Sequence, residues 1–170
     1  TPDDLETVRT QAAAVPQSVG IGLELNPATR QEASGGVGHY RSECGLLLVR
    51  GGTPDLNRFA VEDPRVDVLT APMAEQGDIN HVIAAAAATN GVAVELNLGP
   101  ILRTSGGRRV QAIRDRRKLI ELLDDADALW VTSADAADHL QVRAPRDLVA
   151  LGEVIGVGTD PIETGLATWD

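Results

Sequence analysis

The densest group of basic side chains in the sequence occupies sixteen residues that follow an apolar run. Guanidinium groups bind phosphates and carboxylates through paired, charge-assisted hydrogen bonds, which suits contact with RNA or with an acidic partner. Two glycines in the group would allow a phosphate or another backbone to approach closely. The alternative is a solvated basic face balanced by neighbouring aspartates. The group contains Arg103, Arg108, Arg109, Arg114, Arg116, Arg117 and Lys118.

A helix predicted from Gly107 to Asp124 positions most of these arginines. Arg109 and Arg116 should flank the buried side of this helix, and Arg117 should fall close to it. Arg143 and Arg146, around a second loop-to-helix junction, could join the basic group. The buried side is predicted to consist of Val110, Ile113, Ile120 and Leu123.

Three carboxylates lie on predicted strands, where they could in principle gather around a cation. Glu24 and Glu95 each belong to a Glu-Leu-Asn sequence at the end of a predicted strand, and Asp67 lies on the predicted strand from Val66 to Thr70. The alternative is an internal polar network in which carboxylates pair with arginines. The histidines favour no metal site, because His39, His81 and His139 are scattered and lack ligand spacing.

Val-, Ile- and Leu-rich runs alternate with helical patterns along the chain, which indicates a mostly parallel sheet. Thr1, Thr53 and Asp160 each precede a proline, as an N-cap residue does. Glycines at positions 35, 36 and 38 predict a flexible connection after the first strand. The predicted strands are Val19 to Leu25, Leu46 to Arg50, Val66 to Thr70, Val92 to Leu98 and Ala128 to Thr132. The predicted helices, besides the one from Gly107, are Pro2 to Val15, Pro54 to Glu62, Ile79 to Asn90, Pro145 to Ile155 and Pro161 to Thr168.

Alternating strands and helices permit either an open doubly wound sheet or a TIM-like (β/α) barrel. We favour the barrel, since no Gly-x-Gly-x-x-Gly follows any strand. Only five strands are clear where a full barrel has eight, so we expect an incomplete barrel, and whether an N-terminal strand is missing stays an open question. A single domain over residues 1–170 is expected at this length.

The composition indicates where the protein works and at what salt concentration. Neither a membrane span nor a signal peptide is indicated, so we expect a cytoplasmic protein. The net charge is −10, with fourteen arginines but one lysine, and fifteen of the twenty-five acids are aspartates. This imbalance suits a halophile, because concentrated salt shortens the Debye length to about 3 Å. Net charge therefore does not decide whether the partner is RNA.

Six blocks in the same order resemble one protein family. The resemblance is to protein component 3 of archaeal ribonuclease P, whose eukaryotic counterpart is the thirty-kilodalton subunit. The blocks are residues 57–62, residues 66–69 with Pro72, residues 78–82, residues 94–98, residues 103–109, and residues 140–148 leading to Gly156.

The resemblance implies a barrel related to the polymerase-and-histidinol-phosphatase superfamily, without its metal-dependent activity. It implies a ribonuclease P subunit that assists the catalytic RNA in removing the 5′ leader of precursor tRNA. The isolated protein is then not catalytic and binds no metal or cofactor, and Mg²⁺ belongs to the RNA. Expected partners are ribonuclease P RNA, protein component 2, the other ribonuclease P proteins and precursor tRNA, with no membrane.

Two rival functions stay open. One is a metal-dependent phosphoesterase on the same barrel, with Glu24, Asp67, His81 and Glu95 as ligands. The other is a non-enzymatic barrel that binds another protein through ion pairs of its arginines. With the family resemblance, the candidate RNA- or partner-binding residues are Arg58, Arg103, Arg108, Arg109, Arg116, Arg117, Arg143 and Arg146.

Overall fold

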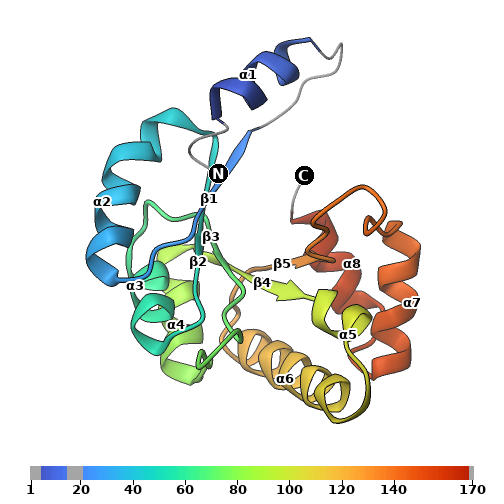
Figure 1. The fold of residues 1–170 in the computed structure, drawn as a ribbon. Helices are drawn as coiled ribbons and strands as arrows, with labels where there is room; N and C mark the ends of the chain where they lie inside the picture. The colour runs from blue at the N-terminus through green and yellow to red at the C-terminus, as the bar shows by residue number, and fades with distance from the viewer. Residues whose placement is uncertain (1–4, 15–20, 169–170) are drawn as a thin grey trace.

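The computed structural model describes residues 5–14 and 21–168, which form one parallel sheet with helices around it (Figure 1). The strands are β1 (Gly22–Leu25), β2 (Leu46–Arg50), β3 (Val68–Thr70), β4 (Ala93–Asn97) and β5 (Trp130–Ser133). The helices are α1 (Leu5–Ala13), α2 (Arg30–Tyr40), the short 3-10 helix η2 (Arg41–Glu43), α3 (Pro54–Glu62), α4 (His81–Asn90), α5 (Gly99–Arg103), α6 (Gly106–Asp125), α7 (Pro145–Ile155) and α8 (Asp160–Ala167).

The strands lie in sequence order, β1-β2-β3-β4-β5, and every neighbouring pair is parallel. A doubly wound sheet reverses its strand order, whereas a (β/α) barrel does not. The predicted α/β barrel type is therefore confirmed. Within the described part of the chain the sheet stays open, because β1 and β5 are its two edges.

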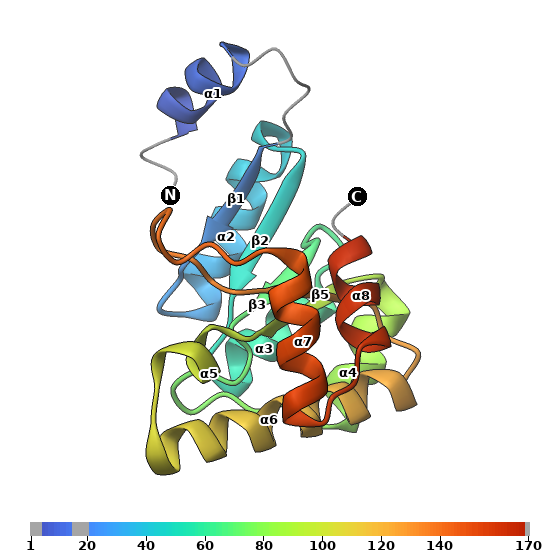
Figure 2. The ribbon, with the colours of Figure 1, turned by 90° about the vertical axis from the view of Figure 1, so that its right-hand side faces the viewer.

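The two faces of the sheet differ. One face packs under the helices as a large apolar core, to which α2, α3, α4, α6, α7 and α8 all contribute. The other face corresponds to a barrel interior and has a small apolar cluster of Val68, Ala93 and Val131, with Leu46 and Leu48 partly covered. It also buries the polar residues Thr70, Glu95 and Asn97. Figure 2 shows α7 beside α8, which packs against β5, and α6 running below the strands. None of the described helices is long and apolar enough to cross a membrane.

Most predicted elements are confirmed, with shifts of one or two residues at those predicted ends that the structure describes. The β2 bounds match the prediction, and Thr53 caps α3 by accepting a hydrogen bond from the Leu56 amide. Asp160 was wrongly predicted as a cap, since it is the first residue of α8 and Thr159 occupies the cap position. The predicted cap at Thr1 and residues 19–20 of the first predicted strand lie outside the described residues.

The predicted flexible glycine connection is wrong, because those glycines lie inside α2. Glycine costs up to about 1 kcal/mol in a helix, but capping and packing offset this cost here. Thr29 accepts a hydrogen bond from the Glu32 amide, and the Glu32 carboxylate accepts one from the Ala28 amide at 2.8 Å. Gly36 also allows close packing, since a Cβ there would lie 3.0 Å from the side chain of Leu25.

Candidate functional site

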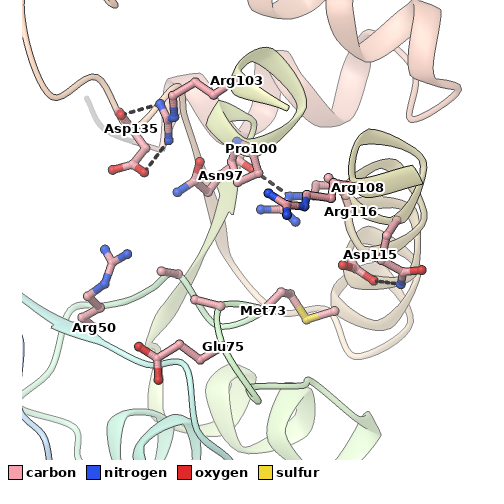
Figure 3. A pocket seen from close by; sticks show the side chains of 14 residues that line it. Arg50, Met73, Glu75, Asn97, Pro100, Arg103, Arg108, Asp115, Arg116 and Asp135 are labelled. Carbon is pink, nitrogen blue, oxygen red and sulfur yellow. Dashed lines mark hydrogen bonds and ion pairs between the residues drawn. The ribbon is translucent and has the colours of Figure 1, made fainter. Parts of the chain in front are cut away.

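A pocket of about 610 Å³ lies at the carboxyl ends of the central strands, between β2, the loop after β3, and α6 (Figure 3). Parallel barrels build their binding sites at this end, because the loops that follow the strands converge there. Arginines approach the pocket from three different elements. The lining residues are Arg50, Ala71, Met73, Ala74, Glu75, Asn97, Pro100, Arg103, Arg108, Gln111, Ala112, Asp115, Arg116 and Asp135.

The loop wall of this pocket is held by Asn57, a fully buried side chain on α3. Its amide nitrogen donates to the carbonyl oxygens of Pro72 and Asp78 at 2.8 and 3.0 Å, and its oxygen accepts from the Gly52 amide. A buried amide is stable only when its groups are bonded in this way. One side chain thus fixes the loops that follow β2 and β3.

Arg116 is the buried arginine of the pocket, with 7% of its surface exposed. Its Nε donates to the carbonyl oxygen of Asn97 at 2.7 Å, at the end of β4. Within the described chain it forms no ion pair, and Asp115 and Glu95 act on it only at longer range. Burial lowers its pKa, because the low-polarity surroundings disfavour the charged form.

The predicted buried side of α6 is confirmed for Leu123 and wrong for Val110, because the side that packs inward is rotated about the helix axis. Val110 is 48% exposed, and Ile113 and Ile120 are only partly buried. The side that packs inward includes Arg116, because its guanidinium reaches the end of β4. The buried residues of α6 are Ala112, Arg116, Leu119 and Leu123.

Arg103 closes one rim of the pocket. It ends α5 and donates to the Asp135 carboxylate and to the Ala134 and Asp135 carbonyl oxygens, at 2.8 to 3.1 Å. Gly99 makes room for this arrangement, since a Cβ there would lie 2.4 Å from the Arg103 guanidinium. Arg103 is therefore held in place by partners of its own.

Arg108 and Arg50 complete the basic lining. Arg108 is exposed in the first turn of α6 and has no hydrogen bond or ion pair to any residue the structure describes. Arg50 ends β2 on the opposite wall, 3.7 Å from the Glu24 carboxylate. Arg50 was missed by the sequence analysis, although strand alternation places it on the interior face with Leu48.

The three carboxylates considered for a cation are not brought together. Glu95 is buried and accepts hydrogen bonds from the Ser133 hydroxyl at 2.5 Å and the Ala71 amide at 2.7 Å. Burial raises its pKa, and those hydrogen bonds only partly oppose the shift. Glu24 accepts from the Thr70 hydroxyl, whereas Asp67 pairs with Arg41 before β3 begins, at the other end of the sheet.

The histidines also stay apart, as predicted. His39 stacks edge-on against Tyr40 in α2, His81 is the first residue of α4, and His139 lies in the loop before α7. Among the residues described, no group of three or more His, Cys, Asp or Glu side chains could hold a metal ion. The phosphoesterase ligands proposed from the sequence therefore do not form a cluster.

The other candidate arginines have separate surroundings. Arg109 donates to the Thr104 carbonyl oxygen at 2.7 Å, and Arg117 donates to that of Ile155 at the end of α7. Arg143 bonds only to carbonyls of its own loop, Arg146 is almost fully exposed on α7, and Arg58 pairs with Glu62 on α3. Arg117 thus has a structural contact, and the others offer exposed charge away from the pocket.

The family model described as RNase P subunit p30 matches residues 6–168. The chain is 52% identical over 151 residues to "Ribonuclease P protein component 3" of Haloarcula marismortui, covering 89% of this chain and 64% of that protein. It is 51% identical to the protein of the same name from Natronomonas pharaonis, covering 93% of this chain and 67% of that one.

Among solved structures, the chain matches one from "cryo-EM structure of archaeal Ribonuclease P with mature tRNA". The TM-score is 0.84 at 29% identity, and the match covers 99% of this chain and 73% of that chain. The chain thus spans about two thirds of the length of the curated relatives, and its fold agrees with the archaeal structure over nearly its whole extent. The chain belongs to the RNase P subunit p30 family.

Proposed function

We propose that this chain acts as a protein subunit of ribonuclease P in the removal of the 5′ leader from precursor tRNA. The observation that carries the proposal is the match over 99% of the chain to a protein within an archaeal ribonuclease P bound to tRNA. The acidic, lysine-poor composition and the haloarchaeal relatives favour work in a concentrated-salt cytoplasm.

Within the holoenzyme we assign catalysis to the RNA, which would also bind the Mg²⁺, and we assign no cofactor to the protein. The carboxylates at the strand ends support this assignment, because each is already engaged. Glu95 accepts two hydrogen bonds, and Glu24 contacts Thr70 and Arg50. A carboxylate engaged in this way is less available as a metal ligand or general base.

The arginines are the part of this chain that would contact the ribonuclease P RNA. Arg103, Arg108 and Arg109 lie together where α5 ends and α6 begins, and Arg108 is without a protein partner among the described residues. Arg58, Arg143 and Arg146 expose further positive charge to RNA or to protein component 2. We assign Arg116 to the same RNA-contacting group, because it lines the pocket with Arg103 and Arg108. We assign Arg117 a structural role, because it donates a hydrogen bond to the Ile155 carbonyl oxygen at the end of α7.

Reconstitution at high salt tests the proposal. Cleavage of a precursor tRNA by the cognate ribonuclease P RNA would be measured with the partner proteins present and this protein added or omitted. We expect the protein to increase the cleavage rate only when the RNA is present. No effect on RNA cleavage, together with metal-dependent phosphate release by the protein alone, would favour the phosphoesterase instead.

The protein-binding alternative differs in its salt response. An arginine surface devoted to protein contacts would show no RNA affinity at any salt concentration. A surface that meets phosphates loses affinity steeply as salt rises, because bound counterions are released on binding. Gel-shift titrations with the ribonuclease P RNA over a salt series would separate the two.

A further inference from the structure

Arg116 holds more hydrogen-bonding capacity than the protein uses. Its side chain is buried, yet of its three nitrogens only Nε has a hydrogen bond within the described chain. The two terminal nitrogens of the guanidinium are not sealed from solvent. Because Arg116 lines the pocket, these nitrogens open into it. A buried guanidinium without a carboxylate is costly, unless a ligand supplies the missing charge.

The charges around Arg116 leave the pocket positive. Figure 3 shows Arg116 and Arg108 directed from α6 toward the pocket, with Arg50 on the opposite wall. Asp135 is engaged with Arg103, and Asp115 accepts a hydrogen bond from Gln111 at 2.7 Å. With Glu75, three carboxylates stand against four arginines in the lining, so the lining side chains carry one net positive charge. Arg108 and Arg116 form no ion pair with any described residue.

The backbone of the lining is unusual in a second respect. Ala71, Glu75 and Asp135 all have φ between 46° and 49°, and Asp127 is the one other non-glycine residue in the described ranges with positive φ. This conformation costs side-chain-bearing residues of order 1 kcal/mol or more and tends to occur at binding sites. Strain is thus gathered around this one pocket.

Two guanidinium groups on one wall suit an anion with several oxygens. A phosphate presents at least two free oxygens and accepts paired hydrogen bonds from an arginine fork. The volume of about 610 Å³ lies within the range of about 300–1,000 Å³ typical of small-molecule sites. It has room for a phosphate together with the sugar or base that carries it.

We propose that this pocket is a phosphate-binding subsite, with Arg116 as the anchor and Arg108 and Arg50 as flanking contacts. That the phosphate comes from RNA rests on the proposed function. The binding of a phosphate group does not rest on the proposed function, since it follows from the unpaired arginine and the cavity. Free phosphate and a nucleotide of RNA share the same recognition chemistry.

The first experiment titrates the full-length protein in molar KCl with inorganic phosphate, adenosine monophosphate and a short RNA, by calorimetry and thermal shift. We expect saturable binding of at least one of the three. Saturation by inorganic phosphate would mean that the pocket takes the free anion, and saturation by the RNA alone would mean that it takes a phosphodiester. Absence of saturation by all three overturns the proposal.

Variants locate the binding. Arg108→Ala should weaken it by about tenfold without changing the fold, the size expected for loss of a charge-assisted hydrogen bond. Arg116→Met should weaken phosphate binding by at least as much. Arg116→Lys keeps the charge, so its affinity should lie between those of the parent and Arg116→Met. Arg114→Ala is the matched control, because Arg114 is an exposed arginine of the same helix outside the pocket lining. Equal binding by Arg108→Ala and the parent overturns the proposal.

The outcome is separable from that of the reconstitution. Phosphate binding that depends on Arg108, without stimulation of the ribonuclease P RNA, would support the subsite and contradict the proposed function. Stimulation of the ribonuclease P RNA without phosphate binding would support the proposed function and contradict the subsite.

Discussion

Two arginines lie at opposite ends of the same sheet and use their guanidinium groups differently. Arg41, before β2, donates to the carbonyl oxygens of Arg65 at 3.0 Å and Gly45 at 3.3 Å, and to the carboxylate of Asp67. The same carboxylate accepts the Leu47 amide at 2.6 Å. The amino end is thus tied together by a guanidinium whose bonds are all internal.

Arg116 is more buried than Arg41 but makes a single hydrogen bond to the described protein. Since burial makes unused donors more costly, the more buried arginine should have been the better paired. The comparison teaches that burial alone does not identify a structural arginine. The guanidinium with spare donors beside a cavity is the one available for a ligand.

The largest effect is expected from Asn57→Ala, which would break the pocket wall. Three backbone groups would lose their partner: the buried Gly52 amide and Pro72 carbonyl, and the partly buried Asp78 carbonyl. We expect a loss of about 3 kcal/mol in the free energy of unfolding, measured by denaturant titration at high salt. A loss below about 1 kcal/mol would show that Asn57 does not hold these loops.

A smaller loss is expected from Asp67→Ala at the amino end. The change removes the partner of the Arg41 guanidinium and the Leu47 amide, and about 2 kcal/mol should be lost. Partial exposure of the pair keeps the value moderate. Phosphate binding at the carboxyl end should be unchanged, and a parallel loss of phosphate affinity would contradict the separation of the two ends.

Arg116→Met should have less effect on stability than Asp67→Ala. The variant loses the hydrogen bond to Asn97 but also removes an unpaired buried charge, and these effects oppose each other. We expect a change within about 1 kcal/mol in denaturant titration, alongside the loss of phosphate binding. A loss above about 3 kcal/mol would show that Arg116 acts structurally, like Arg41.

The smallest effect is a pH dependence at Glu95. Burial raises the pKa of this carboxyl, with Glu24 and Asp135 adding to the shift, so the folded protein binds its proton more readily than the unfolded chain. Stability from this group is therefore present at low pH and is lost as pH rises from about 4.5 through the raised pKa. Glu95→Gln removes the ionisation, so stability relative to the parent should increase across that interval. Parallel pH profiles of the two proteins would contradict this.

Much of the fold could be predicted from the sequence, because strand alternation and proline-led helix starts are local signals. β2 and α3 match their predicted bounds, and the interior placement of Glu95 and Asn97 follows from alternation along β4. α2 could not be predicted, since its glycines indicate a loop and its stability depends on packing against β1.

The pocket could be predicted only in part. The arginine cluster identified Arg103 and Arg108, but the hydrophobic pattern placed Arg116 beside the buried side of the helix, whereas the structure buries it. The burial of Arg116 depends on one carbonyl at the end of β4, a contact between distant residues that no periodicity contains. Arg50 was missed for a similar reason, because its neighbours in the pocket come from other elements.

The measurement that tests the account most directly is precursor-tRNA cleavage by the reconstituted holoenzyme, with arginines removed from one end of the sheet at a time. Arg108→Ala combined with Arg109→Ala changes the carboxyl end, and Arg65→Ala, which removes a partner of Asp63, changes the amino end. We predict that the double variant lowers the stimulation of cleavage by about tenfold or more, as two lost phosphate contacts should, whereas Arg65→Ala matches the parent. Equal stimulation by all three proteins would contradict the account.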